Sequence, residues 1–397
     1  MKKIILVLSM SLIVSSAFST VTLTESSKSG TTVTIGYSYN GSGGFPSTFG
    51  LVLQATGGTI TSVTATKTDG LSTSNSKGFG IFPCTISIDN GDATSYGTPV
   101  EPNGLPGGPS DLGTSRVVVS LSAIYADASG KPDNSGPLFT VVCSSGTTGL
   151  SAAAISEDVF REGVVDVNGV EIDVAPLTVV FPPVFVAAGA AAYSTATIIP
   201  SLPAGIAAGD VLLLFVETSN QNVSIRSQNG GTWAQVARSP QGTTGTRLTA
   251  FWSRYNGTQG APTVSDSGDH QIGRIIAIRG AATSGDPCNI TAGGVEAVTD
   301  TTGSIPGATT TVDNCLIVTA IATSLPDYNY DNDRFSNWTN ADLTNLSERV
   351  DCSRNVGNGG GLGIATGIKA EAGAYGNTAV TLTISAYKGM MSIAIKP

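Results

Sequence analysis

Histidine and charged side chains are scarce in this sequence, and their scarcity excludes several classes of function. Of 397 residues, 12 % are charged and one is a histidine. An average soluble chain carries about twice that share of charge. A single histidine excludes a histidine-rich zinc or copper site. With 20 Lys and Arg against 29 Asp and Glu, the net charge of −9 excludes a basic nucleic-acid-binding surface.

Cysteine is also sparse, and its spacing excludes the common cysteine motifs. The five cysteines contain no CxxC pair, so a zinc ribbon or a thioredoxin-like redox site is not expected. In an oxidising compartment we expect Cys84 to pair with Cys143, and Cys288 with Cys352. Cys315 lies inside an apolar run and is interpreted as a buried thiol.

The first residues have the pattern of a secretory signal peptide. Lys2 and Lys3 precede an apolar run from Ile4 to Val14, and small residues follow up to Ala17. We expect cleavage after Ala17, which makes 1–17 the signal peptide. The alternative is an uncleaved anchor, but a membrane span needs about 20 apolar residues. The mature chain is therefore expected to be secreted or at the cell surface, with no membrane span after cleavage.

Most of the remaining sequence alternates Thr or Ser with Val, Ile, Leu or Tyr, which is typical of β-strands. Glycine-rich and proline-rich stretches separate the alternating segments, as turns between antiparallel strands require. The fold class predicted is all-β, with two tandem antiparallel β-sandwich domains after the signal peptide. The clearest predicted strands are 21–25, 31–39, 59–65, 116–121, 210–216, 247–255, 273–279, 314–322, 380–384 and 391–395.

The domain boundary is predicted where prolines interrupt the strand pattern. Pro176, Pro182 and Pro183 are followed by an Ala/Gly stretch over 187–192. We therefore expect a first domain over 18–178, a Pro/Ala-rich linker over 179–203 and a second domain over 204–397.

One segment departs from the strand pattern. Leu343, Leu346 and Val350 recur at i, i+3 and i+7 within 340–350, a spacing that predicts a short surface helix.

Two sets of short segments carry resemblances to known families. The first set is Gly78–Pro83, Gly97–Val100, Lys131–Phe139 and Phe160–Val165, and the second is Gly209–Leu213, Gly231–Trp233, Ile276–Gly280, Asn358–Gly363 and Met391–Pro397. On the first set, residues from about Leu51 to Asp173 resemble the cohesin-like β-sandwich domains of exported proteins from planctomycete-type bacteria. On the second, residues from about Ala204 to Pro397 resemble a jelly-roll-type module of bacterial surface and phage structural proteins. Neither resemblance implies a catalytic residue.

An acidic loop over 327–333 is the candidate metal site. Oxygen-bearing side chains at alternate positions begin it as a calcium loop begins. The loop departs from the EF-hand pattern, because Asn332 stands where glycine is needed and Trp338 where the closing glutamate is needed. Calcium is the one candidate cofactor, and a solvated turn is the alternative. The candidate ligands are Asp327, Asn329, Asp331 and Asp333.

Aromatic residues beside this loop form the candidate ligand-binding site. Tyr328, Tyr330 and Trp338 present planar rings that can stack on a sugar. They predict polysaccharide as an alternative partner, with the chain acting as a carbohydrate-binding module.

Catalytic residues are hard to assemble from this sequence. His270 is interpreted as a loop histidine beside Asp269, because no GxSxG elbow supplies a nucleophile. The carboxylates Glu157, Asp158 and Glu162 cluster, but sequence cannot place a second carboxylate across a cleft from them. We therefore expect no enzyme activity.

The function expected is that of a secreted or cell-surface structural or adhesive protein of a bacterial envelope, matrix or filament. Its partners would be other extracellular or envelope proteins, including copies of itself. The alternating segment 21–39 follows the cleavage site, so a free N-terminal strand could pair with a neighbour's sheet edge. The alternative is that this segment forms the first strand of its own sandwich.

Overall fold

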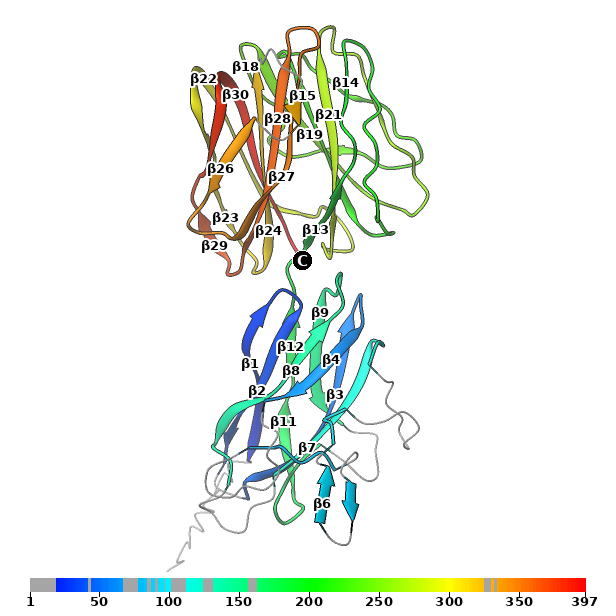
Figure 1. Cartoon of the computed structure of the whole chain (residues 1–397), viewed down its shortest axis with the longest axis vertical. Helices are drawn as coiled ribbons and strands as arrows, with labels where there is room; N and C mark the ends of the chain where they lie inside the picture. Colours follow the sequence, from blue (N-terminus) through cyan, green and yellow to red (C-terminus); the bar gives the residue numbers. More distant parts are fainter. Residues whose placement is uncertain are drawn as a thin grey trace, which may run out of the picture. The chain divides into compact units, whose positions relative to one another are not determined.

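The structure is a computed structural model, and every regular element in its described part is a β-strand (Figure 1). This confirms the all-β prediction. The residues it describes are 19–41, 44–66, 78–83, 87–89, 92–95, 97–100, 112–123, 131–155, 163–324, 330–331 and 334–397.

The chain forms two compact units. The first comprises Met1–Ser145 and Leu150–Val179, and the second comprises Gly146–Gly149 and Val180–Pro397.

The first unit is built on one ten-stranded sheet in the order β12-β9-β3-β10-β11-β1-β2-β8-β4, with β7 paired to β3. A separate short hairpin joins β5 and β6. The strands of the first unit are β1 (Thr20–Ser29), β2 (Thr32–Asn40), β3 (Pro46–Thr56), β4 (Ile60–Ala65), β5 (Ser87–Asp89), β6 (Asp92–Ser95), β7 (Arg116–Ser122), β8 (Ser135–Cys143), β9 (Gly149–Ala154), β10 (Val164–Asp166), β11 (Glu171–Ala175) and β12 (Leu177–Val180).

The core of this unit follows from the alternating pattern of its strands. Along β2 the side chains of Val33, Ile35 and Tyr37 are buried on one face. Tyr37 lies 5.4 Å, centroid to centroid, from Phe49 of β3, and Phe49 lies 4.7 Å from Phe79. Strands β2 and β3 are far apart in the sheet order. Because their aromatic rings touch, the sheet must curl so that its two halves share one core.

Strand β1 has partners on both sides. It is antiparallel to β2 and parallel to β11, and Val21 and Leu23 are buried. The N-terminal segment is therefore an internal strand of its own sheet, as the second interpretation of 21–39 predicts. The structure does not present it as a free strand for donation.

The second unit contains two seven-stranded sheets and two two-stranded sheets, β16-β20 and β23-β29. The first sheet runs β13-β21-β15-β19-β17, with β14 on β21 and β18 on β19; the second runs β22-β30-β24-β28-β27-β25, with β26 on β30. The strands are β13 (Val184–Ala188), β14 (Ala192–Ser194), β15 (Val211–Thr218), β16 (Ile225–Ser227), β17 (Ala234–Gln235), β18 (Gln241–Thr243), β19 (Thr246–Arg254), β20 (Thr263–Val264), β21 (Gln271–Arg279), β22 (Cys288–Ile305), β23 (Ala308–Thr310), β24 (Cys315–Ser324), β25 (Tyr330–Asp331), β26 (Phe335–Thr339), β27 (Thr344–Arg354), β28 (Gly360–Lys369), β29 (Gly373–Tyr375) and β30 (Thr378–Ile395).

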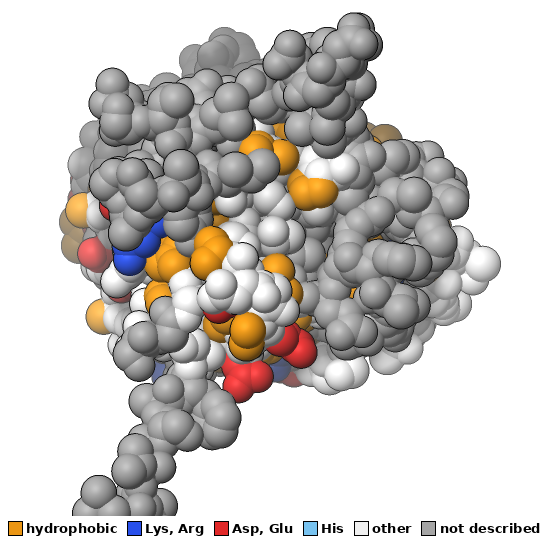
Figure 2. Space-filling view, turned by 90° about the horizontal axis from the view of Figure 1, so that it is seen from below, with side chains coloured by type: hydrophobic (Ala, Val, Ile, Leu, Met, Phe, Trp, Pro, Cys, Tyr) orange, Lys and Arg blue, Asp and Glu red, His pale blue; other side chains and the backbone are white. Residues whose placement is uncertain are grey.

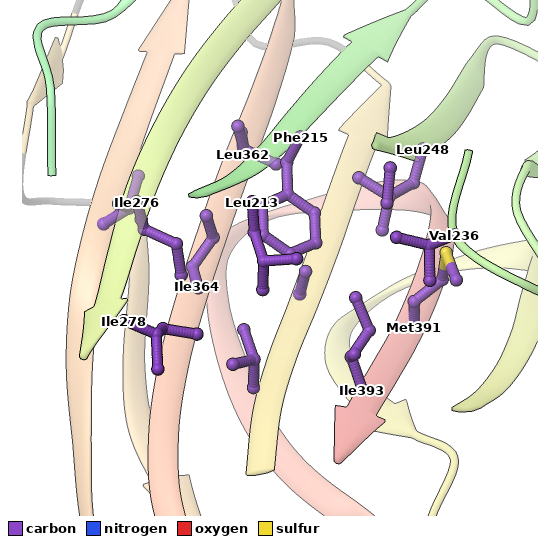
Figure 3. Packing of buried hydrophobic residues seen from close by; sticks show 14 of the residues in the cluster. Leu213, Phe215, Val236, Leu248, Ile276, Ile278, Leu362, Ile364, Met391 and Ile393 are labelled. Carbon is purple, nitrogen blue, oxygen red and sulfur yellow. The ribbon is translucent and has the colours of Figure 1, made fainter. Parts of the chain in front are cut away.

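One hydrophobic cluster joins the two sheets of this unit. Figure 3 shows Leu213 and Phe215 of β15 beside Ile364 of β28, with Met391 and Ile393 of β30 in the same layer. Side chains from both sheets interdigitate there, which makes the unit β-sandwich-like.

The outer faces of both sheets are also covered. Leu212 and Leu214 of β15 pack with Trp233 on the face away from the central cluster. On the other sheet, Ile317 and Ile321 of β24 belong to two further clusters on its outer side. Both faces of β15 and β24 are buried, and this explains why the two strands are nearly continuous apolar runs.

The predicted linker over 179–203 contains two strands of the second unit. β13 and β14 both pair with β21 in antiparallel register. The prolines interrupt the strand pattern only locally, and the Ala/Gly stretch that follows fits beside β21. The second unit therefore begins near Val180, before the predicted start at 204.

The helix predicted over 340–350 is wrong, because most of this segment belongs to strand β27. The register of β27 on β28 shifts between Thr344 and Ser347 and again between Glu348 and Val350. These bulges insert extra residues into the strand, so its apolar positions do not follow the two-residue period of a regular strand.

The core of the second unit gives the first prediction. Leu213→Ala should lower the free energy of unfolding of this unit by about 2–5 kcal/mol, because it leaves a cavity between the sheets. All three tryptophans (Trp233, Trp252 and Trp338) lie in this unit, so their fluorescence during urea unfolding reports on it. The control Ile199→Ala removes an exposed side chain and should change stability by less than about 0.5 kcal/mol. An equal decrease in the free energy of unfolding in the two variants would contradict this description of the core.

Candidate functional site

A buried carboxylate–imidazole pair is the candidate functional site of the second unit. Glu217 is the next-to-last residue of β15, and His270 directly precedes β21. These strands are antiparallel neighbours with Glu217 opposite Ile272, so their ends bring the two side chains together. His270 Nε2 lies 2.9 Å from Glu217 Oε2 and 3.2 Å from Oε1. Thr246, the first residue of β19, donates its hydroxyl to Oε1 at 3.1 Å.

The pair is closed to solvent. Glu217 is 0 % exposed and His270 is 1 % exposed. Burial raises the pKa of the Glu217 carboxyl to about 7, although the hydrogen bonds from His270 and Thr246 act to lower it. Burial by itself lowers the pKa of His270, but the hydrogen bond and charge of Glu217 and the charge of Asp269 raise it by more. The pair therefore holds its protons more tightly than the same groups do in water.

The loop between β27 and β28, from the opposite sheet, closes over this pair. A Cβ atom at Gly360 would lie 2.1 Å from Glu217 Oε2. Gly357 has φ of +60°, and a Cβ there would lie 2.5 Å from Asp269 Oδ1. Asn358 Nδ2 donates to Asp269 Oδ2 at 2.7 Å. The glycine-rich stretch is thus a close-packed turn that ties the two sheets together at this end.

The arrangement does not match a catalytic triad. His270 contacts a carboxylate with Nε2, and Nδ1 is buried without a hydrogen-bond partner. A triad needs a hydroxyl or thiol nucleophile bonded to one ring nitrogen and an orienting acid on the other. The hydroxyl of Thr246 donates to Glu217 and not to His270. Chemically, the pair can store and exchange protons, but it is enclosed away from any substrate.

Sequence reasoning placed His270 in a loop beside Asp269, and the structure confirms this position. It assigned His270 no further partner, and that was wrong. The partner, Glu217, lies 53 residues earlier in the chain. Its only sequence signal is a carboxylate that directly follows the apolar run 211–216.

The predicted calcium and aromatic sites fall mainly outside the described residues. Asp327, Tyr328, Asn329 and Asp333 lie outside them, as do Glu157, Asp158 and Glu162. The backbone of Tyr330 and Asp331 forms β25, which pairs with Ser353 and Cys352 of β27. Within the described part, no group of three or more His, Cys, Asp or Glu side chains is arranged to hold a metal ion.

Trp338 is placed differently from the expected sugar platform. Its ring is half-buried against the outer cluster of the second sheet, 6.3 Å from the ring of Phe335. Its indole Nε1 donates to Glu348 Oε2 at 2.6 Å. Burial raises the pKa of Glu348, while this hydrogen bond acts to lower it. Trp338 therefore contributes to packing.

Neither predicted disulfide is formed among the cysteines that the structure describes. Cys143 and Cys288 are free thiols, and Cys84 lies outside the described residues. Cys352 donates its thiol to the carbonyl oxygen of Leu362, within the central cluster. Cys315 is a buried thiol, as predicted. Burial raises the pKa of Cys143 to about 11, which keeps it protonated at neutral pH.

Comparisons with known proteins add no relative. No protein-family model matches the chain, and no curated protein matches it significantly. Among the elements of the described part, none is a helix of the length and apolarity that crossing a bilayer requires.

The pH dependence of stability tests the Glu217–His270 pair. Folding raises the pKa of Glu217 from 4.5 to about 7 and also raises that of His270. The folded chain then binds protons that the unfolded chain has released, so the stabilisation is complete at low pH and is lost as pH rises. We expect the free energy of unfolding to fall by up to about 3 kcal/mol from pH 4.5 to 8, at about 1.4 kcal/mol per pKa unit.

Glu217→Gln should abolish most of this slope in urea unfolding followed by tryptophan fluorescence. The control Glu371→Gln, at an exposed carboxylate of the same unit, should retain it. A wild-type slope in Glu217→Gln would show that the pair does not titrate as described.

Proposed function

We propose that this chain is a non-enzymatic, exported structural or adhesive protein of a bacterial envelope, extracellular matrix or filament. The observation that supports this most is that the second unit buries both faces of its central strands and its one carboxylate–imidazole pair. Both faces of β15 and β24 are packed, and the Glu217–His270 pair is sealed by the β27–β28 loop. Such a unit is suited to holding a shape and contacting partners with its surface.

The low share of charged side chains on the surface is consistent with a structural role. On the face in Figure 2, the coloured side chains are mostly uncharged, and the acidic and basic ones form small separate groups. Val167 and Val170 of the first unit are more than half exposed, as is Val298 of the second. A surface of this kind favours contacts made through shape and backbone pairing over electrostatic steering.

The finer architecture that we propose is a cohesin-like β-sandwich domain followed by a jelly-roll-like one. Two compact units, and a central cluster shared by two sheets in the second, support this proposal. The resemblance of the two stretches of sequence to exported bacterial proteins supports the compartment. The signal-peptide pattern over 1–17 supports it independently.

The partners that we propose are other envelope proteins or further copies of this chain. Strand β22 is 18 residues long and stands at the end of its sheet order, as β4 and β12 do in the first unit. End strands can extend a sheet by pairing with another chain. Because β1 has partners on both sides, these end strands are better candidates for assembly than the N-terminal strand.

Negative-stain electron microscopy of the purified mature protein tests the proposal. We expect filaments, sheets or regular oligomers, and we expect retention on bacterial envelope material in a co-sedimentation assay. Lys substitutions at Val295 and Val298 on β22 should reduce assembly, because charge on an end strand opposes pairing. The control Ile199→Lys, at an exposed site outside the strands, should assemble normally.

Two outcomes would overturn the proposal. One is a monodisperse monomer that binds no envelope fraction. The other is specific binding to a purified polysaccharide, abolished by a chelator, which would favour the calcium-dependent carbohydrate-binding alternative.

A further inference from the structure

A lysine on the last strand of the second unit is fully buried and contacts two carboxylates. Lys388 of β30 is 0 % exposed. Ala386 and Met390, two residues before and after it on the same face of the strand, belong to an outer hydrophobic cluster. An amine enclosed in this way is shielded from water and held in one position.

Two carboxylates of β22 converge on this amine. Lys388 Nζ lies 2.9 Å from Asp300 Oδ1 and 3.2 Å from Glu296 Oε2. Glu296 stands directly opposite Lys388 in the β22–β30 ladder, and Asp300 stands opposite Ala386. The register shifts between Glu296 and Asp300, and this bulge brings both carboxylates to the same lysine.

The Asp300 carboxyl is also polarised by its own strand. Thr302 donates its backbone N–H to Asp300 Oδ1 at 2.8 Å and its hydroxyl to the same oxygen at 3.1 Å. Lys388 donates to this oxygen too. Donors aimed at one carboxyl oxygen stabilise the negative charge that develops there when a nucleophile attacks the carbon.

From this geometry we propose that Lys388 and Asp300 form an intramolecular amide (isopeptide) bond, with Glu296 relaying the proton. The Glu296 carboxylate takes a proton from the Lys388 ammonium and passes it to Oδ2 of Asp300, so a neutral amine attacks the carbon of a neutral carboxylic acid. Negative charge then develops on Oδ1, which faces the Thr302 donors. When the intermediate collapses, Glu296 carries a second proton from the nitrogen to Oδ2, and Oδ2 leaves as water.

The balance of this step is complete without a co-reactant. One ammonium and one carboxylate become one neutral amide and one water, and no group is oxidised or reduced. The C–N bond forms in the attack, and the C–Oδ2 bond breaks when the intermediate collapses. Asp300 is 44 % exposed, so the water has a route to solvent. The Lys388 hydrogen bond, followed by that of the Thr302 N–H, holds the pKa of Asp300 well below its usual range, so the two reactants are held together as an ion pair before they react.

The bond would join the long end strand β22 to the C-terminal strand β30. Unlike a disulfide, it would withstand reducing agents. It suits a protein that carries mechanical load, but the inference does not depend on the proposed function, because it concerns only the chemistry of three side chains.

Mass spectrometry of the purified full chain tests the bond. We expect an intact mass lower than the sequence mass by one water. Proteolysis should release a branched peptide that joins the segment around Asp300 to the segment around Lys388. An intact mass without water loss, together with two separate linear peptides, would overturn the proposal irrespective of any variant.

Three variants assign the roles. Lys388→Arg should restore the full mass, whereas the control Lys369→Arg, at a partly exposed lysine, should still lose water. Glu296→Gln should leave most of the chain uncrosslinked. Asp300→Asn should lose ammonia in place of water if the amide nitrogen becomes the leaving group. Water loss that persists in Lys388→Arg would place the dehydration elsewhere, for example at an aspartyl succinimide, and would overturn the proposal.

Discussion

Burial of both faces of its central strands is the constraint on which the second unit depends. Every residue of β15 and β24 is buried, because the shared cluster covers one face of each sheet and the outer clusters cover the other. A charged side chain on such strands has no access to water, so its burial is costly unless it meets a partner inside the protein. This accounts for the few charged groups that the unit retains in its interior and for their positions near strand ends and bulges.

Two of the interior charges lie at the ends of β15, and each meets a specific partner there. At the start of β15, Asp210 receives two hydrogen bonds from Arg279, at 2.9 and 2.8 Å. At its end, Glu217 is hydrogen-bonded to His270 at 2.9 Å. Buried pairs of this kind contribute little net stability, since desolvation offsets the attraction, but breaking one by removing a partner is costly. These charge pairs therefore determine which strand ends lie side by side. Lys388 differs because both of its carboxylates, Glu296 and Asp300, are partly exposed to solvent, and this is the setting in which condensation can release water.

The sequence predicted the strands well where period-2 alternation or a continuous apolar run was undisturbed, as in β2, β7, β15 and β24. It failed where bulges disturbed the period. The register shifts of β27 gave Leu343, Leu346 and Val350 a helical spacing. The Ala/Gly stretch beyond Pro183 looked like a linker because small residues carry no pattern, yet it lies along β21. Of the candidate site residues, Trp338 was expected on a platform and is instead held by Glu348.

The sequence by itself determined the fold class, because alternation, apolar runs and turn residues are local properties of the chain. It also determined the exclusions that follow from one histidine and few charges. Only the tertiary structure decided which polar residues meet. Glu217 and His270 are 53 residues apart and Asp300 and Lys388 are 88 apart, and strand pairing alone brings each pair within hydrogen-bonding distance. Chemistry between residues so far apart depends on register, and register is set by the burial of the whole sheet.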